Sequence, residues 1–194
     1  MVMTPDFSEL ATWAAQAPDV PQEWFVHEST LHGVSHTQRV HIHAQRLTCE
    51  LGWTDADTDL VLAAALWHDI GRTHDAFDPS HGAGSAARAV RLGLTGALAP
   101  ADAGVVLFAI VCHSLPDEVA EEEVWRWHAG GGAAGEPRLT EPERALRVLR
   151  LLKDADALDR VRLAPWEGAD PAQLRHPETI ALIPFAATLY AALG

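Results

Sequence analysis

Residues 65–72 read Ala-Leu-Trp-His-Asp-Ile-Gly-Arg, and the predicted fold is organised around this stretch. The apolar residues before it have the pattern of a buried helix over residues 55–72. Near the C-terminal end of that helix stand His68 and Asp69, whose side chains leave a helix about 100° apart and can approach one ion from two directions. Gly71 is predicted to end the helix in the left-handed conformation that glycine adopts readily. A neutral histidine beside a solvated aspartate is the simpler interpretation when this pair is taken alone.

Length and composition indicate one globular domain over residues 1–194. The chain is 48% hydrophobic, which is enough for one substantial core. No apolar run is long enough to span a membrane, and the first ten residues lack the basic start and apolar stretch of a secretory signal. We therefore expect a cytoplasmic protein without a membrane partner. Nothing in the sequence indicates its oligomeric state.

The charge and the cysteines exclude other classes of protein. A formal net charge of −13 argues against a partner that is a long nucleic acid. A small anionic substrate remains compatible with this charge, because a bound divalent cation reverses the local sign. Cys49 and Cys112 lie in apolar helical patterns and are predicted to be buried thiols, too few for a disulfide framework or a cysteine-rich metal site.

Histidines recur in the segment that precedes this helix. Ser35 is predicted to cap a helix that extends to Leu51 and stops at Gly52. His36 lies in the first turn, on the core-facing stripe, where a histidine either packs or binds a metal. The stripe also contains Val40, Leu47 and Leu51. His43 shares this face and is expected in the core or beside the site, whereas His41 is expected on the surface.

Two further histidines stand where chain segments begin or end. A polar loop over residues 72–82 follows the His68 and Asp69 pair and contains His81 near its end. An ordinary loop histidine is the alternative interpretation of His81. A second buried helix opens at Pro100 and ends at His113, which repeats the arrangement at His68.

Two segments lie outside these motifs. Residues 118–136 combine an acidic stretch, predicted as a marginal helix, with a glycine-rich loop over residues 130–135 that could act as a lid. A solvated acidic stretch without a role is the alternative. The chain closes with a helix over residues 177–193, interrupted at Pro184 and expected to pack on the other helices.

The helix that follows the glycine-rich loop carries a carboxylate on its apolar face. Thr140 and Glu143 are predicted to form a capping box at its start. Its apolar stripe is interrupted by Asp156, a costly position unless the charge is neutralised or coordinated. Asp154 points about 200° away and is the weaker candidate. Lys153 is expected to be a salt-bridge partner and not a base.

The polar residues of these helices form an ordered pattern. His36, the His68 and Asp69 pair, and Asp156 together resemble the H…HD…D signature of the HD-domain metal-dependent phosphohydrolase superfamily. The resemblance covers about residues 30–165 and includes the sequences around each motif. It implies an all-α fold, a single-domain helical bundle of five or more helices, with these four residues around a divalent ion. The helix at residues 177–193 would pack on this core.

The resemblance also implies a chemistry. This ligand set suits Mn, Fe, Co, Ni or Zn, whereas Mg prefers more oxygen ligands. Such an ion would activate a water as the nucleophile for cleavage of a phosphate ester. The expected partner is therefore a small phosphorylated substrate, and the expected class of substrate is nucleotides. Asp69 would touch both the metal and the water, and Arg72 would clamp the phosphate. Arg72 could instead pair with Asp75 or Asp78.

His81 and His113 extend the pattern to H…HD…H…H…D, which resembles the dinuclear branch of the superfamily. Two ions would then be bridged by Asp69, with His81 and His113 as ligands of the second. With one ion, the same histidines would bind the substrate phosphate or protonate the leaving group. Two other functions fit the same fold: a di-iron oxygenase, or a metal-binding regulatory module without turnover.

Overall fold

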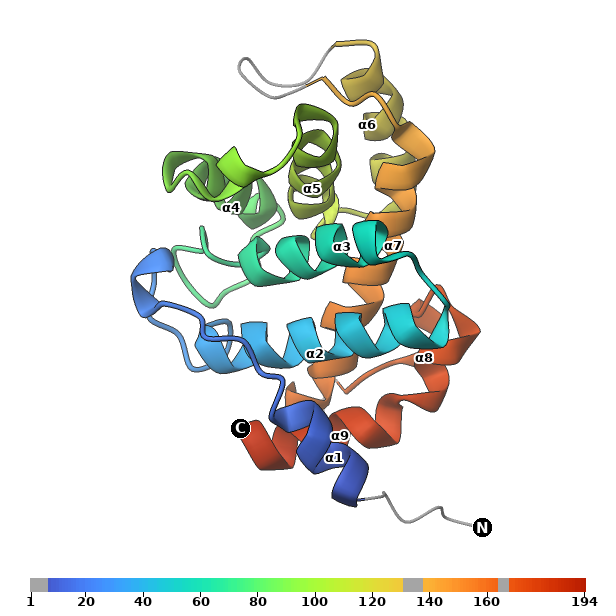
Figure 1. Cartoon of the computed structure of the whole chain (residues 1–194). Helices are drawn as coiled ribbons and strands as arrows, with labels where there is room; N and C mark the ends of the chain where they lie inside the picture. The colour runs from blue at the N-terminus through green and yellow to red at the C-terminus, as the bar shows by residue number, and fades with distance from the viewer. Residues whose placement is uncertain (1–6, 131–137, 164–167) are drawn as a thin grey trace.

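The fold is all-α, as predicted. The computed structural model describes residues 7–130, 138–163 and 168–194, and these residues contain helices and no strand (Figure 1). The α-helices are α1 (Phe7–Ala14), α2 (Val34–Glu50), α3 (Asp55–Trp67), α4 (His81–Arg91), α5 (Pro100–Cys112), α6 (Asp117–His128), α7 (Pro142–Asp159), α8 (Pro177–Ala181) and α9 (Ile183–Leu193). Short 3-10 helices are η1 (Gln22–Trp24), η2 (Leu94–Ala97), η3 (Arg160–Leu163) and η4 (Pro171–Gln173). No helix among the described residues is long and apolar enough to cross a membrane.

Helix α7 is the centre of the bundle. It packs against α2, α3, α5 and α6, and Figure 1 shows it crossing behind α2 and α3. The core between these helices contains Val40, Val61, Phe108, Leu149 and Leu152, none more than 2% exposed. Burial of each such side chain stabilises the fold by about 1.5–3 kcal/mol. This packing brings the start of α2 and the ends of α3, α5 and α7 to one place.

Several helix boundaries follow from local sequence, and those at Pro100 and Gly52 are as predicted. Thr54 caps α3, and its side chain accepts a hydrogen bond from the backbone N–H of Asp57 at 3.2 Å. Helix α5 begins with Pro100, which needs no N–H partner in the first turn. Gly52, with a φ of +63°, follows the end of α2 in the left-handed conformation predicted for it.

Two predicted caps are wrong. Helix α2 begins at Val34, and its cap is Gly33 and not Ser35. Residue 33 must be glycine, because a Cβ there would lie 2.1 Å from the Ser29 carbonyl oxygen. At the start of α7 the cap is Glu141, without a side-chain hydrogen bond, so the capping box predicted for Thr140 does not form.

The expected role of Gly71 is also wrong. Helix α3 ends at Trp67, four residues earlier, and Gly71 has no positive φ. The residue is small for another reason: a Cβ on Gly71 would lie 2.2–2.4 Å from backbone atoms of Gly84 and Ser85. Its N–H donates to the Ser85 hydroxyl at 3.0 Å. Gly71 therefore allows the turn after α3 to touch α4. In addition, His81 is the first residue of α4 and not a loop residue.

Three further expectations concern single residues or short segments. Cys112 is buried as predicted, but Cys49 is exposed, because it lies near the end of α2 and about 100° around the helix from buried Thr48. His41 is half-buried and not a surface residue, since α3, α7 and α9 cover several sides of α2. The glycine-rich 130–135 loop lies outside the described residues except for Gly130.

The C-terminal segment is held to α7 by Asp154. Its fully buried carboxylate accepts hydrogen bonds from the backbone N–H groups of Arg175 and His176 and from the Thr179 hydroxyl, each at about 2.9 Å. We call these four residues the C-terminal anchor. The following helix breaks at Leu182, two residues before the predicted Pro184, and α9 packs against α1, α2 and α7.

Lys153 next to the anchor forms a salt bridge, as predicted. Its partner is Asp117, at 2.5 Å, and not one of the neighbouring aspartates. It also donates to the carbonyl of Leu115, at 2.6 Å. Arg175 pairs with the same Asp117 carboxylate. Lys153 therefore stabilises the loop between α5 and α6.

Candidate metal centre

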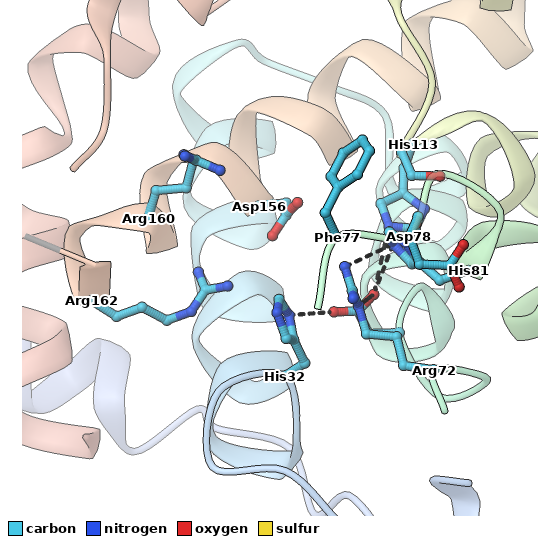
Figure 2. Close-up of a pocket in the computed structure, with 11 residues that line it drawn as sticks. His32, Arg72, Phe77, Asp78, His81, His113, Asp156, Arg160 and Arg162 are labelled. Atoms are coloured by element: carbon cyan, nitrogen blue, oxygen red, sulfur yellow. Dashed lines mark hydrogen bonds and ion pairs between the residues drawn. The ribbon is translucent and has the colours of Figure 1, made fainter. Parts of the chain in front are cut away.

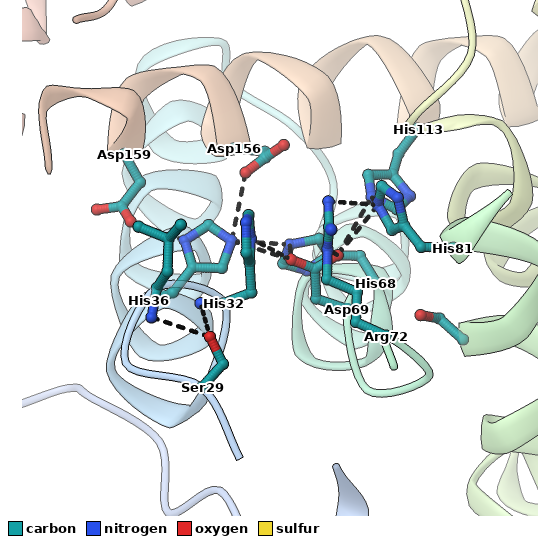
Figure 3. Close-up of polar contacts among 12 residues, drawn as sticks. Ser29, His32, His36, His68, Asp69, Arg72, His81, His113, Asp156 and Asp159 are labelled. Atoms are coloured by element: carbon teal, nitrogen blue, oxygen red, sulfur yellow. Dashed lines mark hydrogen bonds and ion pairs between the residues drawn. The ribbon is translucent and has the colours of Figure 1, made fainter. Parts of the chain in front are cut away.

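Four side chains predicted as metal ligands lie together where the helices converge (Figure 3). His36 Nε2 lies 3.1 Å from His68 Nε2, 3.5 Å from Asp69 Oδ2 and 3.4 Å from Asp156 Oδ1. The first three residues are buried, and the Asp156 side chain is 33% exposed. His36 lies in the first turn of α2, His68 and Asp69 directly follow α3, and Asp156 lies in the last turn of α7, so their approach depends on the packing of these three helices.

Asp69 is the centre of this cluster. Its Oδ2 lies 3.1–3.6 Å from ring nitrogens of one group of histidines, namely His32, His36 and His68. Its Oδ1 lies 3.1 Å from His81 Nε2 and 3.7 Å from His113 Nε2. Burial disfavours the charged carboxylate, but the surrounding imidazoles hold the pKa of Asp69 well below its usual range. The two oxygens thus face two separate groups of imidazoles.

In three of these rings, those of His68, His81 and His113, the outer nitrogen faces a backbone carbonyl. The Nδ1 of His68 donates to Ala65 at 2.8 Å, that of His113 donates to Ile110 at 2.7 Å, and that of His81 donates to the Asp78 carbonyl. Since a carbonyl only accepts, Nδ1 carries the proton in each ring. Burial lowers the pKa of His68 to about 4, so this ring is neutral near pH 7 and its Nε2 has a free lone pair.

Facing ring nitrogens are a feature that a cation would explain. His81 Nε2 and His113 Nε2 are 2.8 Å apart, and His36 Nε2 and His68 Nε2 are 3.1 Å apart. Two lone pairs at such distances repel unless a proton or a metal ion lies close to both. One ion can bind both nitrogens of a pair, and the carbonyl or carboxylate behind each of these rings is the usual outer partner of a metal-binding histidine. The donor set therefore fits a divalent ion.

Asp159 orients His36, a role that sequence reasoning missed. Its buried carboxylate lies 2.7 Å from His36 Nδ1 and accepts two hydrogen bonds from Arg39, at 2.6 and 3.0 Å. Burial and the Arg162 cation oppose protonation of His36, but hydrogen bonds to Asp159 and Asp69 outweigh them and raise its pKa. The available signal was spacing: Asp159 lies three residues after Asp156, on the same helical face.

Three sets of described residues could each hold a metal ion, with all donor atoms within 4.8 Å of one another. They are His32, His36 and Asp69; His36, His68 and Asp156; and His68, Asp69 and His113. His32 was not assigned a role from the sequence, although its position one turn before His36 could have suggested one. His81 belongs to none of these sets but approaches Asp69 as described above.

Comparison with known protein families gives one match. A family model described as the HD domain matches residues 33–161, more than half of the chain. The chain belongs to the HD-domain family. No curated protein and no solved structure matches the chain. HD domains bind divalent metals and are usually hydrolases, which indicates a metal-dependent hydrolase whose buried histidines and aspartates could hold the metal.

The cluster of histidines and aspartates around Asp69 opens into a cavity of about 190 Å³ (Figure 2). Its lining residues are His32, Asp69, Arg72, Phe77, Asp78, His81, His113, Ser114, Asp156, Arg160 and Arg162. Sequence reasoning had not singled out Phe77, Arg160 or Arg162. The two arginines directly follow the last motif, and Phe77 lies in the polar loop, but no periodicity pointed to a cavity.

Arg72 lines the cavity and contacts the cluster. Its Nε donates to Asp69 Oδ1 at 3.0 Å, and its Nη2 lies 3.4 Å from His81 Nε2. Asp75 and Asp78, the alternative partners expected for Arg72, bind other groups. Asp75 accepts a hydrogen bond from the Ser29 hydroxyl, and Asp78 accepts one from the backbone N–H of residue 80. The guanidinium therefore lies where a phosphoryl oxygen near Asp69 would be within reach.

His43 lies apart from the cluster. It is buried, its ring stands edge-on to Phe185 with centroids 6.0 Å apart, and neither ring nitrogen has a hydrogen-bond partner among the described residues. Burial lowers its pKa to about 4. His43 is thus a core residue, one of the two roles expected for it.

Proposed function

We propose that the protein is a metal-dependent phosphohydrolase that cleaves a phosphoester of a small substrate, with nucleotides as the favoured class. The observation that carries this proposal is the arrangement at Asp69, where each carboxylate oxygen faces its own group of imidazoles at the base of a cavity. Family membership independently supports a hydrolase that uses a metal.

In this proposal His36, His68, Asp69 and Asp156 are the ligands of one ion. Asp69, His81 and His113 would hold a second ion, which is supported by the distances of Asp69 Oδ1 from His81 Nε2 and His113 Nε2, 3.1 and 3.7 Å. The imidazole and carboxylate donors suit Mn, Fe, Co, Ni or Zn better than Mg. When bound, such an ion lowers the pKa of a coordinated water and offsets the charge of a phosphoryl oxygen.

The chain's own residues would orient the substrate. The Arg72 fork can bind two phosphoryl oxygens through Nη1 and Nη2, whose present contacts are long, at 3.4 Å, while its Nε keeps the hydrogen bond to Asp69. The Asp69 carboxylate stays ionised, because the surrounding imidazoles hold its pKa well below its usual range, and an ionised carboxylate can accept a hydrogen bond from the attacking water and orient it. In a one-ion enzyme, His81 and His113 would bind the phosphate or protonate the leaving group.

One further residue supports a nucleotide as the substrate. Phe77 lines the cavity mouth, yet it is 90% exposed (Figure 2). A large apolar ring so exposed gains little from the fold, whereas stacking on a nucleobase is worth about 1–3 kcal/mol. The ring stands on the same side of the cavity as Asp156 and His113, where a base could extend beyond the cluster.

The proposal is tested by metal content and turnover together. Protein purified without chelators is analysed for metals, stripped, reloaded separately with Mn, Fe, Co, Ni, Zn and Mg, and assayed for phosphate release from nucleotides and other phosphate esters. We expect hydrolysis with at least one transition metal and little with Mg. Absence of hydrolysis with every metal would contradict the proposal, and oxygen consumption by the iron form alone would indicate the oxygenase.

A further inference from the structure

His32 lies in the loop before α2 and lines the cavity beside the four predicted ligands, which are His36, His68, Asp69 and Asp156 (Figure 2). Its side chain is 14% exposed, and its Nδ1 lies 3.1 Å from Asp69 Oδ2. Its ring stands edge-on to that of His36, with the ring centroids 5.6 Å apart. One donor atom of each of His32, His36 and Asp69 lies within 4.8 Å of the other two. His32 is therefore within reach of an ion that His36 and Asp69 hold.

The spacing of these donor atoms is that of a coordination shell. Two ligands bound to one ion at about 2.1 Å lie about 3.0 Å apart when their bonds meet at a right angle, and about 3.4 Å apart at the tetrahedral angle. His36 Nε2 lies 3.1 Å from His68 Nε2 and 3.4 Å from Asp156 Oδ1. The distance of 3.1 Å between His32 Nδ1 and Asp69 Oδ2 falls in the same range. His32 is thus spaced from Asp69 as the predicted ligands are spaced from one another.

A turn before α2 fixes the position of His32. The Ser29 hydroxyl accepts hydrogen bonds from the backbone N–H groups of Leu31 and His32, at 2.9 and 2.7 Å (Figure 3). The same hydroxyl donates to Asp75 at 2.5 Å, so the turn is also tied to the loop that follows α3. Gly33 comes next and allows the chain to pass close to the Ser29 carbonyl. Because its backbone is held in this way, the His32 ring is pre-organised at the cavity, as a metal ligand must be.

We propose that His32 is a fifth protein ligand of the ion that the four predicted ligands hold. It stands outside the H…HD…D signature. The shell of the ion would then contain three imidazoles and two carboxylates, and a sixth position would stay open for water or a substrate oxygen. A third imidazole should increase the preference for Fe, Co, Ni or Zn over Mg. This inference rests on the metal site of the proposed function, but it concerns binding and can be tested without turnover.

The alternative is a role outside the shell, in which His32 Nδ1 donates a hydrogen bond to Asp69. Loss of affinity alone does not separate the two roles, because removing an outer partner of a ligand also weakens metal binding by about 10- to 100-fold. Two substitutions do separate them. A glutamine at position 32 keeps an N–H donor for Asp69 but is a poor ligand for a transition metal, whereas an ionised glutamate is a good ligand and cannot donate.

The affinity test measures cobalt binding by competition with a chelator. The dissociation constant should rise by about 100-fold in both His32→Ala and His32→Gln, and His32→Glu should recover at least about tenfold of this loss. The matched control is His74→Gln, which should bind cobalt as the wild type does, because His74 is an exposed histidine of the loop after α3. Circular dichroism checks that every variant is folded.

The paramagnetic NMR spectrum of the cobalt-loaded protein counts the bound imidazoles, since the ring protons of a cobalt-bound histidine are strongly shifted. His32→Ala and His32→Glu should each lack the strongly shifted signals of one ring. Retention of all these signals in His32→Ala, or affinity restored by glutamine and not by glutamate, would overturn the inference even if the protein is a hydrolase. Absence of cobalt binding by the wild type would overturn it as well. Loss of one ring's signals, without hydrolysis of any ester by the wild type, would support the fifth ligand and refute the proposed activity.

Discussion

Asp154 and Asp156 are two residues apart on α7 and lie in opposite surroundings. The Asp154 carboxylate is fully buried, and the C-terminal anchor fills its acceptor positions with backbone and side-chain donors. Asp156 is 33% exposed, lines the cavity and lies 3.4 Å from His36 Nε2. A buried carboxylate whose acceptors are filled holds the fold together. One that faces a cavity and a ring of imidazoles has acceptor capacity left for an ion.

The largest effect is expected at the centre of the cluster. Asp69→Ala should lower phosphohydrolase activity by about 1000-fold or more and abolish tight metal binding, because this carboxylate contacts both groups of histidines. The helical fold should persist, which circular dichroism can check. The exposed Asp170→Ala variant is the control. Near wild-type turnover by Asp69→Ala would show that the site is elsewhere.

The contrast between Asp154 and Asp156 can be tested by exchanging each carboxylate for an amide. Asp156→Asn should reduce activity and metal affinity by at least about 100-fold with little change in the free energy of unfolding. Asp154→Asn should instead lower the free energy of unfolding by about 2–4 kcal/mol, because an amide cannot accept all the donors of the anchor, and should leave activity within a few-fold.

Both variants must be assayed at the same metal loading, and their stabilities are compared by denaturant unfolding. Equal activity losses, or a greater loss in Asp154→Asn, would move the ligand assignment from Asp156 to Asp154. Such a result would also mean that filled acceptors do not separate structural from ligating carboxylates in this chain.

A smaller loss of activity, about 10- to 100-fold, is expected for His81→Ala and His113→Ala. If Asp69 bridges two ions, each variant should lower the metal content from two ions per chain to one, measured on protein purified without chelators. One ion in the wild type and in both variants, with activity lost, would instead assign these histidines to phosphate binding. Full activity in both variants would remove them from the mechanism.

Much of the fold could be predicted because it depends on periodicity. The apolar patterns placed α2, α5 and α7 to within a few residues, since each of these helices buries a continuous face. Predictions at the helix ends were less successful. Ser35 is a good capping residue by type, but α2 begins at Val34 with Gly33 as its cap. Gly33 and Gly71 must be small because of close contacts with Ser29 and α4. Such contacts between segments leave no periodic trace in the sequence.

The candidate site divides in the same way. Apart from His32, the histidines and aspartates that the structure brings around Asp69 were predicted from motifs that stand at helix ends, where a polar group breaks an apolar pattern. The cavity residues Phe77, Arg160 and Arg162 could not be predicted, because they lie in a loop and in a 3-10 helix. His32 and Asp159 were visible as neighbours of ligands, but their contacts depend on where loop and helix finally pack.

The smallest expected effect extends the comparison to two histidines of α2. His36 is surrounded by carboxylates that raise its pKa, whereas His43, on the same helical face, has its pKa lowered to about 4 from an ordinary 6.5 by burial. Between pH 6.5 and 4 the unfolded chain therefore binds a proton at residue 43 that the folded protein excludes, and stability falls as the pH falls through this window. Removing that proton site in His43→Leu should flatten the loss of unfolding free energy between pH 7 and pH 5 by about 2 kcal/mol, measured by denaturant unfolding of both proteins with chelator present. An unchanged slope would mean that His43 is protonated in the folded state, and that burial beside Phe185 does not set it apart from His36.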